Sequence, residues 1–384
     1  MAKVYHYASG TWATLSRSYF AAAQSNAWGQ LGWNHASTEG VWTMATLREV
    51  AELAAVSVAT ASRVLNGSDH PVSRDVRESV RTAAETLGYT PSAAAQALKQ
   101  QRSKIIGVIA SDILDPYFAE LTRGIEIEAA KYGFVTILAN ANRDPEQERM
   151  KFRVLREHQA SGIVFCGSDI EGAPGTAQLA REVNLAVRSG TRVVALAPRG
   201  FDSTKIIIDN DAASYELTRY MLSLGHRSIT FIGGMPGLTA VEQRTVGYRR
   251  AMYEAHALPH VVGGTGMRQE SGRDAMAQLV SSGQLPQAIV CANDEIAVGV
   301  LAYLWSSGYK TPDDVSVAGI GGTRGGAVFG LTTMTLPLVE LGGLAAGYIA
   351  NASDSPPVPD PPRFELSLGV TTAKATSLTA APGS

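Results

Sequence analysis

Residues 46–67 read TLREVAELAAVSVATASRVLNG, and this stretch decides the fold of the first domain. Thr46 and Glu49 form a capping box, the signature of a helix start, and Ser57 offers a second N-cap after a tight turn. Asn66-Gly67 ends the second helix. One face of each helix is apolar, as expected for helices that cover a core. These apolar residues are Leu47, Val50, Ala51 and Ala54, then Ala61, Val64 and Leu65.

Such a helix pair has two interpretations: an ordinary helical hairpin, or a helix-turn-helix whose second helix enters the DNA major groove. The next residues favour the second interpretation. Ser73 starts a third helix, so three helices close a small core, and an Ala-rich segment of about two turns, too short to be stable alone, follows Pro91. The apolar face of the third helix consists of Val76, Val80, Ala83, Ala84 and Leu87.

Residues 46–67, followed by Leu-Gly-Tyr-Thr-Pro at 87–91, resemble the LacI family of bacterial repressors. The resemblance implies a hinge helix that carries Ala95 and Leu98 to the minor groove, where Leu98 kinks the duplex. Ser92 stands where the family usually has Asn. Ala55 stands where Gly is common in the turn, so it must keep a negative φ or accept strain.

The outward face of the second helix carries small side chains. Val58 and Ala59 can touch thymine methyl groups but cannot form bidentate hydrogen bonds with bases. Arg63 suits polar contact with a base or phosphate. Hydroxyl groups nearby are expected to hold phosphates. The full predicted DNA-binding set is Thr46, Ser57, Val58, Ala59, Thr60, Ser62, Arg63, Asn66, Ala95 and Leu98.

Composition indicates a soluble, multidomain chain of 384 residues with 45% hydrophobic content and no run long enough to span a membrane. The net charge of the whole chain is −2, but residues 44–104 carry a small excess of positive charge, with eight Lys and Arg against six Asp and Glu. Cys166 and Cys291 lie in apolar runs, which indicates buried thiols in a reducing cytoplasm. No His and Cys cluster has metal-ligand spacing, so neither a metal nor a cofactor is expected.

The expected domains are a helix-turn-helix domain at 44–90, a hinge and linker at 91–103, a core at 104–375 and a flexible tail at 376–384. Residues 1–43 hold four of the five Trp without helix or strand periodicity. We interpret them as a disordered or mis-assigned extension. A Trp-bearing arm that binds a partner is the alternative.

From Ile105 onward, short apolar runs alternate with amphipathic stretches, which predicts parallel sheets flanked by helices. The span favours two α/β lobes with a cleft between them, and it resembles the periplasmic-binding-protein-like core of the LacI family. The expected strands are Ile105–Ile109, Gly162–Phe165, Arg192–Leu196, Lys205–Ile208, Ile229–Ile232, Ala288–Cys291 and Val315–Ala318.

Ligands of open parallel sheets bind beyond the carboxyl ends of the strands. This rule selects Asp112, Asp209-Asn210-Asp211 and the effector set listed below. Asp115 is equally suited to cap the helix that follows it. For Asp209-Asn210, the start of a helix is the preferred interpretation. The resemblance implies that Arg244, in an Arg-x-x-Gly-Tyr motif, and Asn293 reach an effector. The predicted effector set is Asp115, Tyr117, Phe118, Arg244, Asn293 and Asp294.

Two departures from the family concern acidic residues that often bind sugars. After Ile320, Gly321-Gly322 stands where an Asp-Asp pair is usual, and the run from Ala195 to Arg199 lacks a common Asp. The resemblance to the family therefore does not imply that the effector is a sugar. The loop at 319–326 could bring backbone amides and Arg324 to an anion, although a flexible turn is the simpler interpretation.

These features predict a ligand-responsive transcriptional repressor that binds a pseudo-palindromic operator in double-stranded DNA as a homodimer. A small molecule, a sugar or another polar metabolite, would switch it through cleft closure. A solute-binding protein without a transcription role is the alternative, and it would need export. An α/β enzyme would need a catalytic constellation that the sequence does not assemble, so no catalytic residue is predicted.

Overall fold

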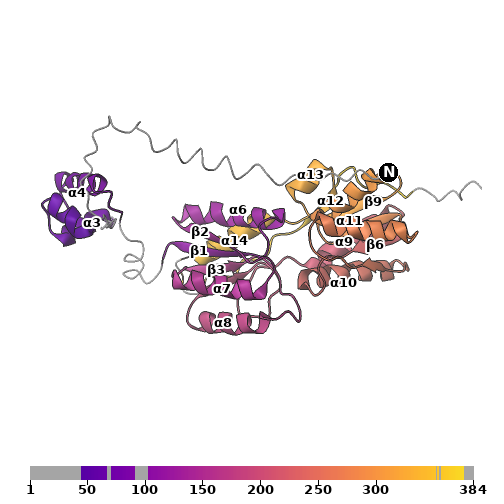
Figure 1. Ribbon diagram of the computed structural model, residues 1–384, viewed down its shortest axis with the longest axis horizontal. Helices are drawn as coiled ribbons and strands as arrows, with labels where there is room; N and C mark the ends of the chain where they lie inside the picture. Colours follow the sequence, from indigo (N-terminus) through magenta and orange to yellow (C-terminus); the bar gives the residue numbers. More distant parts are fainter. Residues whose placement is uncertain (1–44, 67–70, 91–102, 352, 354–355, 376–384) are drawn as a thin grey trace, which may run out of the picture. The chain divides into compact units, whose positions relative to one another are not determined.

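The computed structural model describes residues 45–66, 71–90, 103–351, 353 and 356–375. They form two compact units, one within residues 1–91 and the other within residues 92–384 (Figure 1). The predicted extension at 1–43, the hinge residues Ala95 and Leu98, and the tail at 376–384 lie outside the described residues.

The first unit contains the three expected helices, α2 (Leu47–Leu53), α3 (Val58–Leu65) and α4 (Arg74–Thr86). Its capping box is confirmed, because the Glu49 amide donates to Thr46 Oγ1 at 3.3 Å and the Glu49 carboxylate accepts from the Thr46 amide at 2.6 Å. Ser57 and Ser73 cap α3 and α4. Leu87 was expected in the core but is 36% exposed. The buried core consists of Val50, Ala51, Ala54, Ala61, Val64, Val80, Ala83 and Ala84.

The turn between α2 and α3 accepts strain at Ala55, whose φ is +52°. Left-handed backbone costs a residue with a Cβ roughly 1–2 kcal/mol. The turn holds this conformation because the Val56 amide donates to the Ala51 carbonyl at 2.9 Å. The Ala that replaces the family's Gly therefore keeps the turn geometry and bears the cost.

We expect Ala55→Gly to stabilise the DNA-binding unit by roughly 0.5–1 kcal/mol, because Gly adopts this φ without a steric penalty but loses more chain entropy. Calorimetry of the full chain should show a higher melting temperature for the transition of this unit. Ala59→Gly, inside α3, is the matched control and should destabilise the same unit. A fall in stability for both variants would contradict the strain assignment.

The second unit contains two sheets, and its parallel α/β class is confirmed. The first sheet has the order β2-β1-β3-β4-β5 and is wholly parallel, and the second has the order β11-β10-β9-β8-β6-β7 with only β11 antiparallel to its neighbour. The strands of the first sheet are β1 (Ile105–Ala110), β2 (Val135–Asn140), β3 (Gly162–Phe165), β4 (Arg192–Ala195) and β5 (Thr204–Lys205). Those of the second are β6 (Ile229–Ile232), β7 (His260–Val262), β8 (Ala288–Cys291), β9 (Ser316–Gly321), β10 (Thr332–Thr335) and β11 (Glu365–Ser367).

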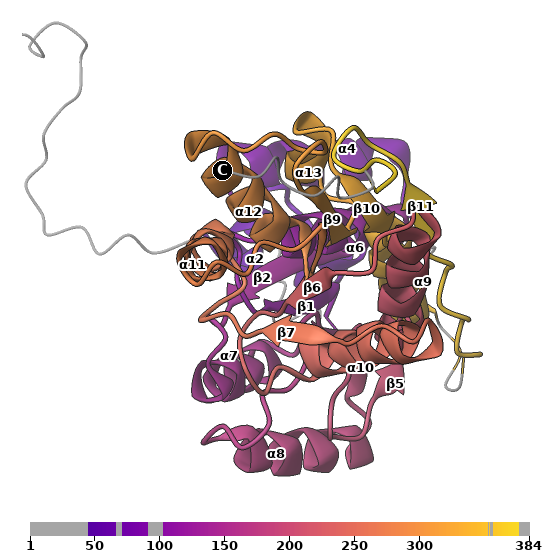
Figure 2. The ribbon, with the colours of Figure 1, turned by 90° about the vertical axis from the view of Figure 1, so that its right-hand side faces the viewer.

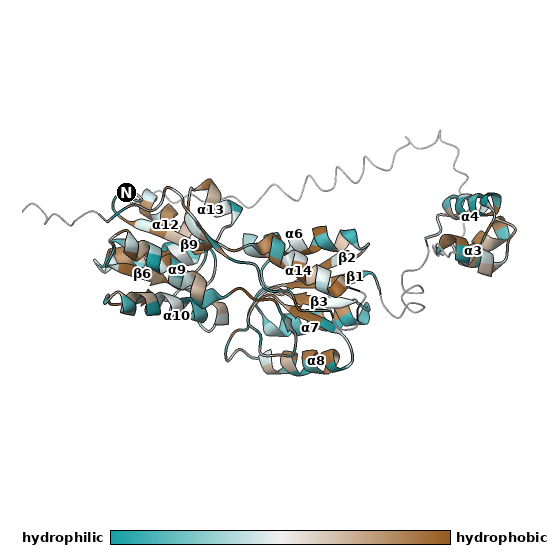
Figure 3. Ribbon diagram, turned by 180° about the vertical axis from the view of Figure 1, so that it is seen from behind, coloured by the Kyte–Doolittle hydropathy of each residue, from teal (hydrophilic) through white to brown (hydrophobic). Residues whose placement is uncertain are grey.

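Helices cover both sheets, which gives two layered lobes, here lobe 1 and lobe 2. In lobe 2, α9 and α10 lie on one side of the sheet and α11 and α12 on the other (Figure 2). The covering helices carry hydrophilic and hydrophobic faces (Figure 3). Lobe 1 has α6 (Pro116–Lys131), α7 (Pro145–Glu157), α8 (Thr176–Arg188) and α14 (Leu338–Ala350). Lobe 2 has α9 (Asn210–Ser223), α10 (Thr239–Glu254), α11 (Gln269–Ser281), α12 (Asp294–Ser306) and α13 (Arg324–Val328).

The chain passes between the lobes three times: from β5 to α9, from β10 to α14 and from α14 to β11. The second passage returns α14 to lobe 1, where it packs on α6. Glycine permits this contact, because a Cβ at Gly124 would lie 2.0 Å from the Val339 carbonyl oxygen and one at Gly342 would lie 2.2 Å from that of Leu121. The backbones of α6 and α14 therefore touch directly.

The strand predictions were incomplete. All seven expected runs contain strand residues, but the fourth ends at Lys205, because Ile206 and Ile208 already belong to the passage toward α9. The strands β2, β7, β10 and β11 were missed. Apolar residues of β2 are exposed, Val135 by 65% and Leu138 by 47%, so this edge strand lacks the burial that the sequence rule assumes.

Candidate functional site

A cavity of about 720 Å³, including its open mouth, lies between the two lobes. All six residues of the predicted effector set line it. They come from the start of α6 in lobe 1 and from α10 and the start of α12 in lobe 2. The carboxyl-end rule therefore brings together side chains that are up to about 180 residues apart in the sequence.

Asp115 caps α6, since its carboxylate accepts from the Tyr117 amide at 3.0 Å. It also pairs with Arg143 Nη2 at 3.0 Å. Burial raises the pKa of Asp115 to about 6, although Arg143 opposes this shift. The capping interpretation is thus confirmed, and the same carboxyl group lines the cavity.

We expect the raised pKa of Asp115 to make stability depend on pH. Between pH 4 and 6 the unfolded chain releases a proton that the folded chain keeps, so the stability present at low pH is lost as pH rises to about 6. Asp115→Asn keeps the N-cap but does not titrate. As pH rises from 4 to 6, the native chain should lose stability and Asp115→Asn should not, so the free energy of unfolding of the variant should rise relative to that of the native chain.

The measurement is urea unfolding at several pH values, with exposed Asp313→Asn as the control for loss of a carboxylate. A constant difference between Asp115→Asn and the native chain at every pH would disprove the assignment.

Arg244 lies in α10 with 5% of its surface exposed. Its Nε donates to Asn210 Oδ1 at 2.9 Å and its Nη1 donates to the Ala292 carbonyl at 2.5 Å. Burial lowers the pKa of the guanidinium group. The side chain is fixed by two neutral acceptors and faces the cavity wall that Tyr117 shares.

Asn293 and Asp294 have structural partners of their own. Asn293 caps α12 by accepting from the Ile296 amide at 2.8 Å and donates to the Met267 carbonyl at 2.9 Å. Asp294 is fully buried and accepts from the Thr323 amide at 2.7 Å and the Thr333 hydroxyl at 2.6 Å. Asp294 therefore anchors the loop after β9 to α12.

This anchoring bears on the proposed anion role of the loop at 319–326. The Thr323 amide is occupied by Asp294, the Gly322 amide donates to Thr333 Oγ1 at 3.3 Å, and the Gly326 amide donates to Thr323 Oγ1 at 3.3 Å. Arg324 is 2.8 Å from Glu120 of lobe 1. Three amides of the loop therefore have protein partners and are not available to an anion.

Several lining residues were not predicted, above all Arg143 and Glu295. Arg143 follows the missed strand β2 and sits over the Phe118 ring at 5.5 Å. Glu295 accepts from Gln269 Nε2 at 3.0 Å. Had β2 been identified, the carboxyl-end rule would have selected Arg143.

A bidentate ion pair joins the lobes beside the cavity. Arg268, at the start of α11 in lobe 2, donates from Nε and Nη2 to the two oxygens of Asp112 in lobe 1, at 3.0 and 2.9 Å. Asp112 itself is 5% exposed. Together with Arg324 and Glu120, this pair spans the gap between the lobes at two points.

Arg199 ends the run in which the sequence lacks the family's common Asp. It is 6% exposed and forms a bidentate pair with buried Glu148 at 2.6 and 2.8 Å. It also donates to the Gly167 carbonyl at 2.5 Å and to Asp169 at 3.1 Å. This cation is therefore fully engaged inside lobe 1.

The candidate DNA face of the first unit is largely hydroxyl and methyl in character. Val58, Ala59 and Arg63 are exposed, as expected. The Ser57 and Thr60 hydroxyls lie 2.9 Å apart, and Asn66 Nδ2 donates to Ser62 Oγ at 3.0 Å. The described part of the predicted DNA-binding set thus lies on α3 and at the N-cap of α2.

Two family models match the chain. Residues 46–92 match "Bacterial regulatory proteins, lacI family", and residues 103–342 match "Periplasmic binding proteins and sugar binding domain of LacI family". The chain belongs to the LacI family.

Curated relatives support this membership. The LacI-family chain is 32% identical over 310 residues to the HTH-type transcriptional regulator RegA of Clostridium saccharobutylicum, covering 79% of this chain and 91% of RegA. It is 32% identical over 281 residues to the HTH-type transcriptional repressor CytR of Escherichia coli strain K12, covering 72% and 80%. The homologues are transcriptional regulators.

Solved structures of the LacI family share the fold. A lac repressor dimer bound to operator and the anti-inducer ONPF matches with a TM-score of 0.76 and 24% identity, over 86% of this chain and 100% of that chain. The cellobiose complex of the regulator CelR matches with a TM-score of 0.60 and 26% identity, over 85% and 99%. None of the helices described for this LacI-family chain is long and apolar enough to cross a membrane.

Proposed function

We propose that this LacI-family regulator is a repressor that binds a pseudo-palindromic operator as a homodimer and is switched by a small molecule in the cavity between the lobes. The observation that carries the proposal is the convergence of Arg244, Asn293 and Asp115 on one cavity, in a chain that also has a helix-turn-helix. The predicted effector set forms the proposed binding site.

DNA reading is assigned to α3. Arg63 supplies the polar contact, while Val58 and Ala59 contact thymine methyl groups. One such helix reads half a site, so a two-fold dimer is needed for a full operator. The hinge positions Ala95 and Leu98 are proposed to reach the minor groove and kink the duplex. We propose that the protein acts in the cytoplasm and that the site binds its ligand without catalysis.

The switch is assigned to closure of the lobes around the cavity. A coupling of ~1–3 kcal/mol between the two sites changes operator affinity roughly 5–150-fold. The Asp112–Arg268 pair supports this proposal, because it connects the strand end that precedes Asp115 to the segment that holds Asn293.

Selection of genomic DNA fragments by the purified full chain tests the DNA role. We expect enrichment of a pseudo-palindrome, weaker binding at higher salt, and reduced operator bending with Leu98→Ala. Arg63→Ala should weaken binding, whereas Arg181→Ala, in lobe 1, should not. Absence of salt-dependent binding to any fragment would refute the proposal.

The cross-lobe pair gives a further prediction. We expect Arg268→Ala and Asp112→Asn each to change operator affinity by the same factor, up to about fivefold, because Arg268 is half-exposed and such pairs contribute modestly. The double variant should change affinity no further. Operator titration by fluorescence anisotropy measures this, and additive effects of the two substitutions would rule out the coupling.

A further inference from the structure

Arg244 differs from Arg143, which also lines the cavity and is paired with Asp115 at 3.0 Å. Among the described residues, no carboxylate lies within ion-pair distance of it, and its printed partners, Asn210 Oδ1 and the Ala292 carbonyl, are neutral. The residue is nevertheless buried, with only 5% of its surface exposed. A buried cation is costly unless a counter-charge accompanies it.

The acidic residues around the cavity have partners of their own. Asp115 pairs with Arg143 at 3.0 Å, and Asp294 accepts from Thr323 and Thr333. Glu295 accepts from Gln269 at 3.0 Å. Arg244 is therefore a cavity cation that forms no direct ion pair among the described residues, although the charges of Asp294 and Asp115 act on it from a greater distance.

The loop after β9 has glycines where a carboxylate could otherwise reach the cavity. Gly321 has no side chain, and a Cβ at this position would lie 3.1 Å from the Asp294 carboxylate. Gly322 has a φ of +73°, and a Cβ there would lie 2.6 Å from the Thr335 side chain. An acidic side chain at either position would therefore meet a neighbouring side chain and a strained backbone.

We propose that the effector is a small carboxylate whose anionic group pairs with Arg244. The proposal rests on the proposed function of the cavity and names the chemical class of its ligand. A carboxylate matches the planar guanidinium group with charge-assisted hydrogen bonds and supplies the missing charge.

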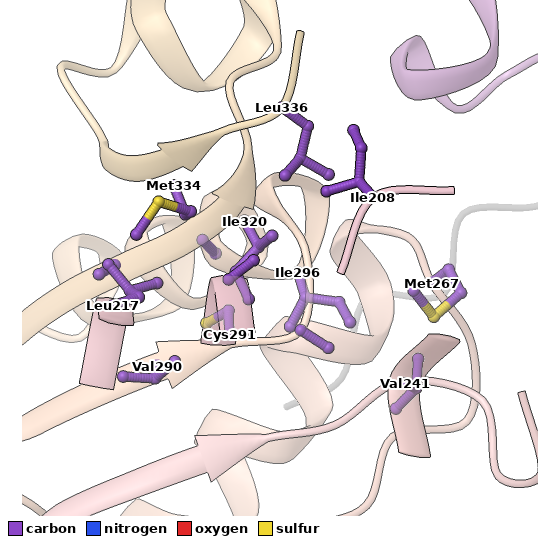
Figure 4. Close-up of a cluster of buried hydrophobic side chains, with 14 of the residues drawn as sticks. Ile208, Leu217, Val241, Met267, Val290, Cys291, Ile296, Ile320, Met334 and Leu336 are labelled. Atoms are coloured by element: carbon purple, nitrogen blue, oxygen red, sulfur yellow. The ribbon is translucent and has the colours of Figure 1, made fainter. Parts of the chain in front are cut away.

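The aliphatic part of the cavity wall indicates an apolar body for this carboxylate, beside polar lining residues such as Ser168 and Thr323. Figure 4 labels five apolar lining residues within the packed side chains of the core. Aliphatic side chains give the hydroxyls of a sugar few partners but favour burial of a hydrocarbon or an aromatic ring. The labelled lining residues are Ile208, Val241, Met267, Ile320 and Leu336.

Asn210→Asp offers a direct test, because it places a carboxylate 2.9 Å from Arg244 Nε in nearly the same shape. The probes are aliphatic and aromatic monocarboxylates from acetate to phenylpropionate, each with its primary amide, and glucose and ribose as neutral polyols. Calorimetric titration of the native full chain should show a carboxylate that binds about tenfold or more tightly than its amide. Asn210→Asp should bind this carboxylate about tenfold more weakly and melt at a higher temperature without ligand.

Gln287→Glu is the matched control. It adds the same charge to lobe 2, but it lies at the opposite end of β8, where its oxygen accepts from the Arg227 and Ser228 amides. Its carboxylate affinity should equal that of the native chain.

Failure of every carboxylate to bind, or equal affinity in Asn210→Asp and the native chain, would overturn the carboxylate assignment. If polyols bind, the proposed function survives that failure. If no probe binds and a metabolite extract leaves operator binding unchanged, the proposed function falls as well.

Discussion

Replacing Arg199 by Met is expected to lower the free energy of unfolding of the two-lobed unit by about 3–5 kcal/mol. The loss arises because the buried Glu148 carboxylate would have no cation to pair with. Glu148 is 4% exposed and accepts both of its bidentate hydrogen bonds from Arg199. Met fills a similar volume, so the loss reflects an uncompensated buried charge rather than a void.

Chemical unfolding followed by circular dichroism measures this loss. The double variant Arg199→Met with Glu148→Gln should recover much of the stability, since it removes both charges. Exposed Arg181→Met, also in lobe 1, should change stability by less than about 0.5 kcal/mol. A double variant no more stable than Arg199→Met would show that packing, not charge, is responsible.

Removal of the Asp294 side chain should have the next largest effect. Asp294→Ala leaves the buried Thr323 amide and Thr333 hydroxyl without their acceptor. We expect a loss of about 2–4 kcal/mol from the unsatisfied groups and the vacated volume. Because Gly321 and Thr323 line the cavity, the freed loop should also abolish the effector response of operator binding.

Asp294→Asn keeps the volume of the side chain and most of its hydrogen bonds, so it isolates the contribution that the anchoring contacts make to stability. Its amide oxygen can still accept from the Thr323 amide, and its amide nitrogen can donate to the Thr333 hydroxyl, so it should lose less than half of what Asp294→Ala loses. Exposed Asp313→Asn in the same lobe is the control and should be neutral. Thermal unfolding and operator titration measure both effects. Equal losses for the Ala and Asn variants would refute the anchoring role.

The features predicted correctly from the sequence are local ones. Thr46 with Glu49, and Ser57, mark helix starts within a few residues, so their caps were found without tertiary information. The six effector positions follow strands or motifs that the sequence displays plainly.

The missed features depend on distant contacts or on weak patterns. The half-exposed edge strand β2 and the three-residue strand β7 were overlooked, and with them Arg143, Met267 and Arg268, which follow their ends. Asp294 was predicted as a ligand contact, but its anchoring role depends on Thr333, which is 39 residues away. No short-range pattern encodes that pairing.

The return of α14 to lobe 1 has a consequence for how the protein is made. Lobe 1 is assembled from residues on both sides of lobe 2 in the sequence, so the face of α6 that carries Leu121, Gly124 and Ile125 has no covering helix until α14 has been synthesised. During translation, this apolar face must stay uncovered while the ribosome completes all of α9 to α13. The first lobe to emerge is thus among the last to be finished.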